Sequence, residues 1–277
     1  MNVIKLSAPA TREFWEIPVL FEDEHLLALD KPSGLLTAPD REDAEAEAER
    51  PNLMRLLHDA IAAQKPWATQ RGLTFLNNAH HLDGDTSGVL LLAKSKPVSA
   101  ALADQFGIDK PVSKFFTLIA GLPSSDRFEM DAKLGLLEGP LVMARVDPVN
   151  GKKCKTVFEV VEKFSGYTTL LCHPLTNRIH QLRAHLRHAG FPIVGDKLYG
   201  GKPLWLSRLK KDFYLKPGRE ERALISRVAL HAEQLSLTHP VTNETVTITA
   251  PLPKDLRVAL RYLREFGGNK RGTAAAD

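Results

Sequence analysis

The chain has 277 residues, 43% of them hydrophobic and 25% charged, which is typical of a globular protein with a sizeable core and excludes a disordered or fibrous chain. The formal net charge of +4 permits nucleic-acid binding without requiring it. No segment approaches the ~18 apolar residues of a membrane span, and neither Cys154 nor Cys172 lies at metal-ligand spacing. We therefore predict a cytoplasmic protein with reduced thiols, no signal peptide and no membrane contact.

The first half of the chain alternates short apolar runs with turn residues. Residues 19–23 and 26–30 are predicted to form a β-hairpin that ends at the turn of residues 31–34. Leucine and alanine at helical spacing predict a helix over residues 53–63. A buried strand, a short helix and another strand are predicted next, over residues 89–93, 100–106 and 115–120.

The second half is predicted to be rich in strands. Strands of a mostly antiparallel sheet are predicted over residues 141–146, 156–161 and 167–172. Helices are predicted over residues 179–188, with Gly190 after the end, and over residues 256–266. A hairpin of residues 230–237 and 245–248 lies between them. Because strands dominate and helices separate them, we predict an α+β fold.

Charge is unevenly distributed along the chain. The acidic run of residues 42–49 would repel phosphate, so it should face away from any bound RNA or form a mobile loop. Lysine and arginine make residues 178–222 locally basic, either as a solvated face or as an RNA-binding surface. The tail of residues 267–277 is predicted to be disordered.

Asp83 is the first candidate for chemistry. It follows His80-His81-Leu82 and lies in a turn with Gly84, ahead of the predicted buried strand. Backbone N–H groups and hydroxyls in such a turn can hold a carboxylate, and glycine lets the chain approach a ligand. From residue type alone, Asp83 could be a nucleophile, a general base, a metal ligand or a turn-former.

Basic and amide side chains recur at helical spacing near residue 180. An arginine such as Arg178 would keep a buried aspartate ionised and oriented if it lay within ~4–6 Å. His180, His185 and His188 are spaced i, i+5, i+8, whereas two imidazoles share a helix face at i, i+4, so we predict no metal site.

Two segments together carry a resemblance to a known family. Residues 79–95 and 175–200 resemble the signature segments of RNA pseudouridine synthases of the RluA type, written HRLDxxTSG and TGRxHQIRxH. The resemblance extends over roughly residues 17–255 and implies the pseudouridine synthase fold, a bisected, mixed but mostly antiparallel sheet with flanking helices and a central cleft. It implies a catalytic domain of residues 17–266, after a short extension of residues 1–16.

The resemblance also implies roles for individual residues. Asp83 takes the position of the family nucleophile, and Arg178 that of the arginine that orients it. The family pattern KxYxAxVxG is matched from Lys114, which places Phe116 where tyrosine is usual. A phenylalanine ring can still stack on uracil but has no phenol, and Lys114 and Arg183 would support phosphate or the core.

Two further departures concern the signature segments themselves. His81 replaces the arginine of HRLD, which in the family helps to hold RNA where the target base flips out. Asn177 replaces the glycine of TGR, a milder change because asparagine tolerates left-handed backbone.

The combined prediction is an RNA pseudouridine synthase, an isomerase acting on a uridine in a stem-loop of ribosomal or transfer RNA. It needs no cofactor, no metal and no obligate protein partner, and we expect a monomer. Asp83 would either add to the sugar or act through a glycal; both routes are compatible with the sequence. The rival interpretations are an RNA-binding protein without catalysis and a metal-dependent hydrolase built on the histidines.

Overall fold

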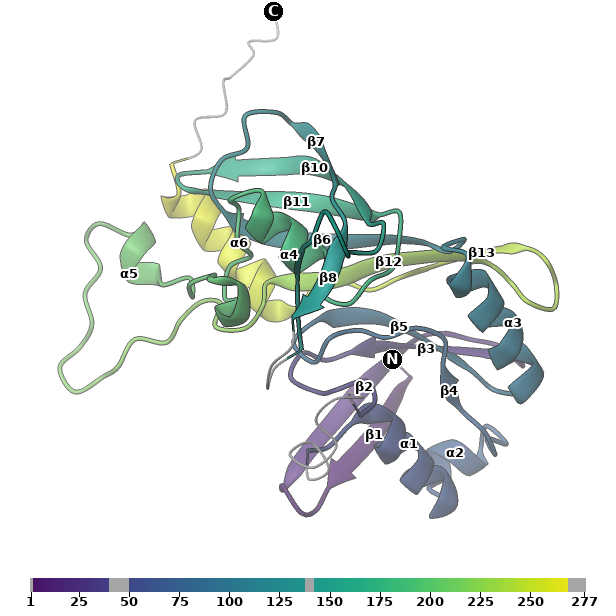
Figure 1. Ribbon diagram of the computed structural model, residues 1–277. Coiled ribbons are helices and arrows are strands. Elements are labelled where there is room, and N and C mark those ends of the chain that lie inside the picture. Colours follow the sequence, from purple (N-terminus) through teal and green to yellow (C-terminus); the bar gives the residue numbers. More distant parts are fainter. Residues whose placement is uncertain (1, 40–49, 138–141, 269–277) are drawn as a thin grey trace, which may run out of the picture.

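Figure 1 shows the computed structural model of the chain, which describes residues 2–39, 50–137 and 142–268. The predictions for the acidic run of residues 42–49 and for the tail beyond residue 268 lie outside these ranges. Within the described residues, eleven strands form one mixed sheet and two more form a separate hairpin, with helices packed on the sheet. The predicted α+β class with a mostly antiparallel sheet is confirmed.

The large sheet has an N-terminal and a C-terminal half. In spatial order, the N-terminal half contains β1 (Val3–Ala8), β2 (Glu13–Glu22), β3 (Leu26–Lys31) and β5 (Ser87–Ala93), with β4 (Asn77–Asn78) also paired to β5. The C-terminal half continues with β12 (Leu230–Thr238), β6 (Val112–Ala120), β11 (Tyr167–Pro174), β10 (Lys155–Phe164) and β7 (Arg127–Asp131), with β13 (Thr245–Thr249) on β12. Hairpins such as β1–β2 and β10–β11 join neighbours in sequence, whereas β12 inserts between β5 and β6, strands that precede it by more than 100 residues.

A short parallel junction joins the two halves. β5 runs parallel to β12, and the paired residues are Ser87 with His231 and Gly88 with Ala232. Gly88 has a φ of +114°, and a Cβ there would lie 2.2 Å from the carbonyl oxygen of Ala232. Any side chain at this position would push the strands apart. The sheet is thus bisected next to the turn that precedes β5.

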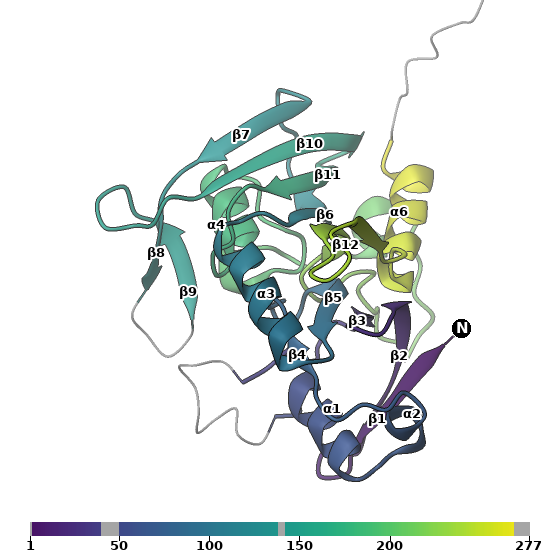
Figure 2. The same ribbon diagram turned by 90° about the vertical axis from the view of Figure 1, so that its right-hand side faces the viewer.

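Helices cover both halves of the sheet (Figures 1 and 2). α1 (Leu53–Ala62) and α2 (Pro66–Thr69) pack on the N-terminal half, and α3 (Lys96–Gly107) packs beside β5 and β13. α4 (Gln181–His188) and α6 (Lys254–Phe266) bury their apolar sides against the C-terminal half, and η1 (Lys197–Tyr199) and α5 (Leu206–Leu209) follow α4 in the chain. In α6 the buried residues recur at helical spacing, as its amphipathic sequence predicts: Leu256, Ala259, Leu260 and Leu263.

The sheet begins earlier in the chain than predicted. β1 pairs antiparallel with β2, from Val3 opposite Pro18 to Ala8 opposite Glu13. Alternate residues of β1 are buried, which is the pattern of a half-buried strand. The boundary predicted after residue 16 falls inside β2, so residues 3–16 belong to the sheet and are not a separate extension.

One predicted strand lies outside the main sheet. The strand expected over residues 141–146 is β9 (Met143–Val146), and residue 141 is outside the described ranges. β9 pairs with β8 (Leu134–Leu137), and this hairpin packs beside α4 through a small cluster that includes Ala144 and Tyr199. The hairpin thereby contributes Leu136 to the lining of a cavity at the centre of the fold.

Candidate active site

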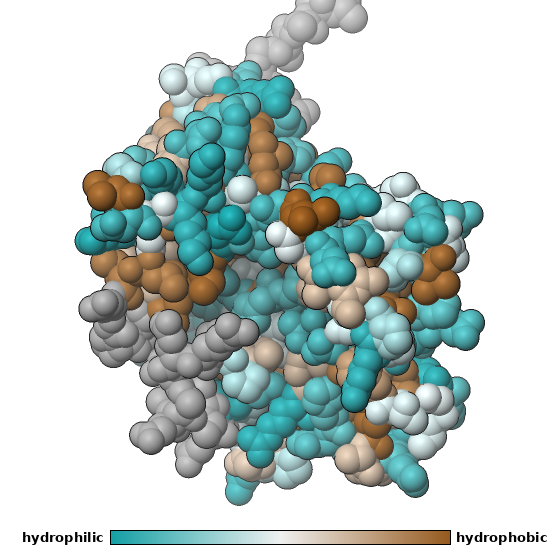
Figure 3. All heavy atoms as spheres, turned by 45° about the vertical axis from the view of Figure 1, so that its right-hand side comes forward, coloured by the Kyte–Doolittle hydropathy of each residue, from teal (hydrophilic) through white to brown (hydrophobic). Residues whose placement is uncertain are grey.

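A cavity of about 870 Å³ opens along the junction between the two halves of the sheet. Its walls come from the turn before β5, from β6 and from the segment that leads into α4, with Asp83, Phe115 and Arg183 among the lining residues. Figure 3 shows the hollowed middle of this face, where hydrophilic residues gather. The size is that of a site for a small molecule or a single nucleotide.

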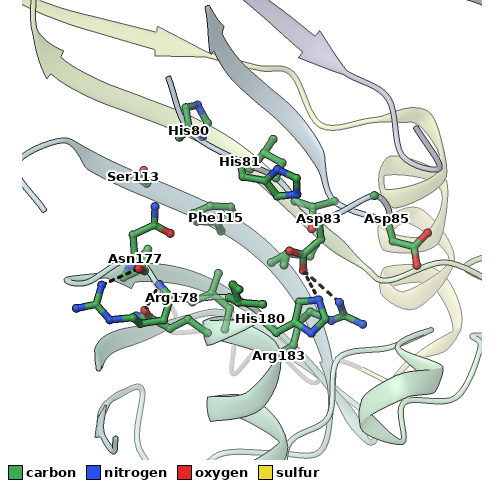
Figure 4. Close-up of a pocket in the computed structure, with 18 of the residues that line it drawn as sticks. His80, His81, Asp83, Asp85, Ser113, Phe115, Asn177, Arg178, His180 and Arg183 are labelled. Carbon is green, nitrogen blue, oxygen red and sulfur yellow. Dashed lines mark hydrogen bonds and ion pairs between the residues drawn. The ribbon is translucent and has the colours of Figure 1, made fainter. Parts of the chain in front are cut away.

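Asp83 is held through one of its two carboxylate oxygens (Figure 4). Arg183 Nη1 donates to Asp83 Oδ2 over 3.1 Å, and His180 Nε2 lies 3.7 Å from the same oxygen. The other oxygen, Oδ1, has no partner among the residues that the structure describes. The side chain is 24% exposed, so Oδ1 is available to a ligand in the cavity.

Arg183 is itself fixed between two carboxylates. Its Nε and Nη2 donate to Asp196 Oδ2 and Oδ1 over 2.8 and 2.9 Å, and its guanidinium lies 5.0 Å from the ring centre of Tyr199. Burial by itself lowers the pKa of Arg183, but the hydrogen bonds and charges of Asp196 and Asp83 outweigh it and raise that pKa. Arg183 is therefore a permanent cation with a rigid orientation.

The structure corrects the expectation that Arg178 orients Asp83. Arg178 Nη1 donates to the carbonyl oxygen of Asn177 over 2.8 Å, and the ion pair of Asp83 is made by Arg183. α4 begins only at Gln181, because His180 adopts a left-handed φ of +51°. Arg178 therefore lies before the helix on the wall of the cavity, whereas Arg183 in the first turn of α4 points to Asp83 (Figure 4).

A buried lysine fastens the turn that carries Asp83. Lys31 Nζ donates to the carbonyl oxygens of Pro32, Leu35 and Gly84, over 2.9, 2.6 and 3.1 Å. Burial lowers the pKa of Lys31 to about 7, against the opposing effect of Asp83 and Asp85. Because Gly84 follows Asp83 directly, these bonds tie the end of β3 to the turn that carries Asp83.

The structure also shows that the aromatic residue of β6 in the cavity is Phe115, whereas Phe116 was expected from the sequence. Phe116 is 5% exposed and packs in the core of the C-terminal half, whereas Phe115 lines the cavity. Side chains alternate between the faces of a strand, so a shift of one residue exchanges the faces. The same alternation places Ser113 on the cavity wall, and Lys114 is not among the lining residues. Counting back from Gly121, the last residue of KxYxAxVxG, would have identified Phe115 and Ser113.

These two phenylalanines allow a matched comparison. Phe116→Ala is expected to lower the free energy of unfolding by about 3–5 kcal/mol, because it empties a fully buried site. Phe115→Ala should cost only about 1–2 kcal/mol but should lower kcat/KM on RNA by about 10–100-fold through lost stacking. Urea unfolding and product formation measure the two effects. If both variants are assayed under conditions where each is folded and they lose the same activity, the assignment of Phe115 to the cavity is wrong.

The remaining predicted histidines have separate surroundings. His81, the residue in the arginine position, lines the cavity near Asp83 (Figure 4). His80 Nε2 accepts from the Leu91 N–H, and burial lowers the pKa of His80 to about 4. His185 contacts Thr156 Oγ1 and the Ala132 carbonyl, while His180 contacts Tyr199 and Asp83. Within the described ranges, no group of three His, Cys, Asp or Glu side chains is placed to hold a metal.

Comparison with known proteins identifies the family. Residues 25–188 match the family model described as RNA pseudouridylate synthase, a range that contains Asp83, Phe115 and Arg183. The chain belongs to this family. It is an RNA pseudouridine synthase, and thus an isomerase, as the sequence predicts.

Two named relatives of this synthase agree with its assignment to the family. It is 32% identical to ribosomal large subunit pseudouridine synthase D of Xanthomonas campestris pv. campestris, over 95% of this chain and 74% of that one. It is also 32% identical to ribosomal large subunit pseudouridine synthase C of Escherichia coli (strain K12), over 89% of this chain and 70% of that one.

Similar folds occur in two solved human proteins. The structure of human RNA pseudouridylate synthase domain containing 4 has a TM-score of 0.65 at 20% identity and covers 89% of this synthase and 92% of its own chain. Human RNA pseudouridylate synthase domain containing 1 has a TM-score of 0.58 at 22% identity, covering 90% and 94%. Among the described helices of the synthase, none has the length and apolar character needed to cross a membrane.

Proposed function

We propose that this synthase converts a uridine of ribosomal large-subunit RNA to pseudouridine, with Asp83 as the nucleophile. The observation that carries the proposal is the Asp83 carboxylate, held through Oδ2 by Arg183 while Oδ1 is open to the cavity. The ribosomal substrate is supported by the names of the relatives with 32% identity.

The chemistry needs only groups that line the cavity. A uridine flipped out of its stem would enter with its base against Phe115, at an unstacking cost of a few kcal/mol. Asp83 Oδ1 then either attacks C1′ and displaces uracil, or removes a proton from C2′ and forms a glycal. Uracil turns and its C5 bonds to C1′, while the Asp83–C1′ bond breaks in the first route or Asp83 returns the proton to C2′ in the second. The proton on C5 then leaves and N1 gains one. The atoms of the substrate are only rearranged, so no co-reactant is consumed.

Arg183 and Lys31 would prepare Asp83 for this reaction. Arg183 compensates the charge of the carboxylate and fixes Oδ2, so that rotation of Asp83 is restricted before substrate binds. Lys31 holds the backbone of the turn through Gly84. Both contacts are made by the protein's own side chains and backbone, which is the kind of preorganisation that catalysis requires.

RNA backbone contacts are proposed for the basic segment after α4. All of the lysines and arginines between residues 197 and 222 are exposed: Lys197, Lys202, Arg208, Lys210, Lys211, Lys216, Arg219 and Arg222. Each cation placed on a phosphate releases counterions and makes affinity depend on salt. The segment is continuous in sequence with the part of η1 that supports Arg183.

The proposed function is tested by tritium release from RNA labelled at C5 of uridine. Wild-type enzyme is incubated with unmodified large-subunit ribosomal RNA and, in parallel, with unmodified transfer RNA. We expect release from the ribosomal RNA at one uridine, mapped by primer extension after carbodiimide labelling, because pseudouridine has the same mass as uridine but retains the label. Release from transfer RNA alone would overturn the ribosomal substrate. RNA binding without release from either RNA would favour a binding protein that has lost catalysis.

A further inference from the structure

His180 stands between the nucleophile and a buried tyrosine. Its Nε2 lies 3.7 Å from Asp83 Oδ2, and its Nδ1 lies 3.1 Å from the hydroxyl of Tyr199. The residue adopts a left-handed φ of +51°, a conformation that costs energy for a residue other than glycine. Figure 4 shows the ring beside Arg183 and directed at Asp83. Strained backbone at a site that also contacts the nucleophile points to a role in the reaction.

The hydroxyl of Tyr199 can hydrogen-bond to His180 Nδ1 whether the imidazole is neutral or protonated. Tyr199 Oη accepts from the Ala144 N–H over 2.8 Å, and its own proton can go to the Ala144 carbonyl at 3.1 Å or to His180 Nδ1. Burial raises the pKa of Tyr199 to about 12, so the phenol keeps its proton. Tyr199 is 2% exposed, so these partners replace water.

The hydrogen-bond partners of the ring place a hydrogen on His180 Nε2 in both the neutral and the protonated imidazole. In the neutral ring, Tyr199 donates to Nδ1 and the single ring proton lies on Nε2, facing Asp83. In the protonated ring, Nδ1 donates to Tyr199, whose hydroxyl turns to the Ala144 carbonyl, and Nε2 again carries a proton. The opposite neutral tautomer would set a bare Nε2 lone pair against a carboxylate, which is unfavourable.

We propose that His180, held by Tyr199, is a positioning residue that directs its Nε2–H at Asp83 Oδ2 and so leaves Oδ1 as the reacting oxygen. This inference rests on the proposed role of Asp83 as nucleophile. Arg183 contacts Oδ2 from one side and His180 from another. Two donors on the same oxygen restrict rotation of the carboxylate more than a single donor does.

Two amide variants separate this role from a purely structural one. In His180→Gln the amide nitrogen can occupy the place of Nε2 and still donate to Asp83. In His180→Asn the amide occupies the place of Nδ1 and reaches only Tyr199, but asparagine tolerates the left-handed backbone better than glutamine does. If His180 has only a structural role, His180→Asn should therefore be the more stable and more active variant. If His180 positions Asp83, His180→Gln should be the more active one.

The first measurement is steady-state kinetics of both variants on the RNA that the wild type modifies. We expect His180→Asn to lower kcat about 10²-fold and His180→Gln to lower it less than about tenfold, with KM within about threefold of wild type for both. The reverse order of kcat, following stability in urea unfolding, would overturn the proposal. So would a loss confined to KM.

The second measurement does not depend on activity. Nitrogen-15 spectra of the RNA-free protein report which ring nitrogen of His180 carries hydrogen, with His180→Gln used to assign the signals. We expect Nε2 to be protonated on both sides of the titration of the ring. A neutral ring without hydrogen on Nε2 would overturn the proposed role of His180, whatever the activity of the enzyme. Failure of the wild type to modify any RNA would instead overturn the proposed function, and the tritium assay detects that separately.

Discussion

Asp83→Asn is expected to lower pseudouridine formation by about 10⁴-fold or more, the scale on which removal of a nucleophile acts. Asparagine has the size of aspartate and can still accept from Arg183 at the place of Oδ2. Its amide nitrogen, however, can neither add to C1′ nor remove a proton from C2′. RNA affinity should stay within about twofold, because one carboxylate in the cavity contributes little to a surface that binds through phosphate contacts.

Asp85→Asn is the matched control for this prediction. Asp85 lies in the same turn, is exposed and points away from the Asp83–His180–Arg183 group (Figure 4). Its structural contact is a backbone one, the Ser33 hydroxyl bonded to the Asp85 carbonyl over 2.7 Å, which the substitution keeps. We expect activity near that of the wild type. Tritium release from both variants and filter binding to the same RNA measure the two effects. Equal product from Asp83→Asn and wild type would disprove the role of Asp83.

Arg183→Met is expected to impair both folding and activity. The carboxylate of Asp196 is fully buried and both of its oxygens accept from Arg183, so loss of the guanidinium leaves an uncompensated buried charge. Such a loss typically costs about 3–5 kcal/mol of unfolding free energy. Asp83 Oδ2 also loses its 3.1 Å donor, and we expect kcat to fall by about 10²-fold or more through misplacement of the nucleophile.

A double variant separates these two consequences. In Arg183→Met with Asp196→Leu, the buried carboxylate is gone together with its partner, so most of the lost stability should return. Activity should not return, because Asp83 still lacks its cation. Urea unfolding gives the first quantity and single-turnover product formation the second. Recovery of activity together with stability would mean that Arg183 acts only through the fold.

Local patterns were sufficient for most of the elements. Leucine and alanine spacing predicted the helix that is α1, and apolar runs predicted β5, β10 and β11 within a few residues. Such patterns report burial on one face of an element, which the sequence records directly. β1 was missed, although Ile4, Leu6 and Ala8 alternate as in a strand, because three apolar positions beside a terminus are a weak signal.

Residue-level roles were harder, because they depend on register and on the start of a helix. A difference of one residue separates Phe116 in the core from Phe115 in the cavity. A left-handed residue at His180 delays α4, so that Arg183 and not Arg178 reaches Asp83. No contact with Asp83 or Arg183 was predicted for His180, Tyr199 or Asp196, since each acquires its role only through partners distant in sequence.

The sequence by itself determined the family, the α+β class and the position of Asp83 in a turn ahead of a buried strand, since these follow from local pattern and ordered motifs. Only the tertiary structure decided which side chains surround that carboxylate. The parallel junction of β5 and β12 joins halves of the sheet that are far apart in the chain and sets Asp83 opposite α4. Which arginine, which phenylalanine and which histidine face the cavity then follows from pairing register and helix phase, and a shift of one residue in either exchanges the faces.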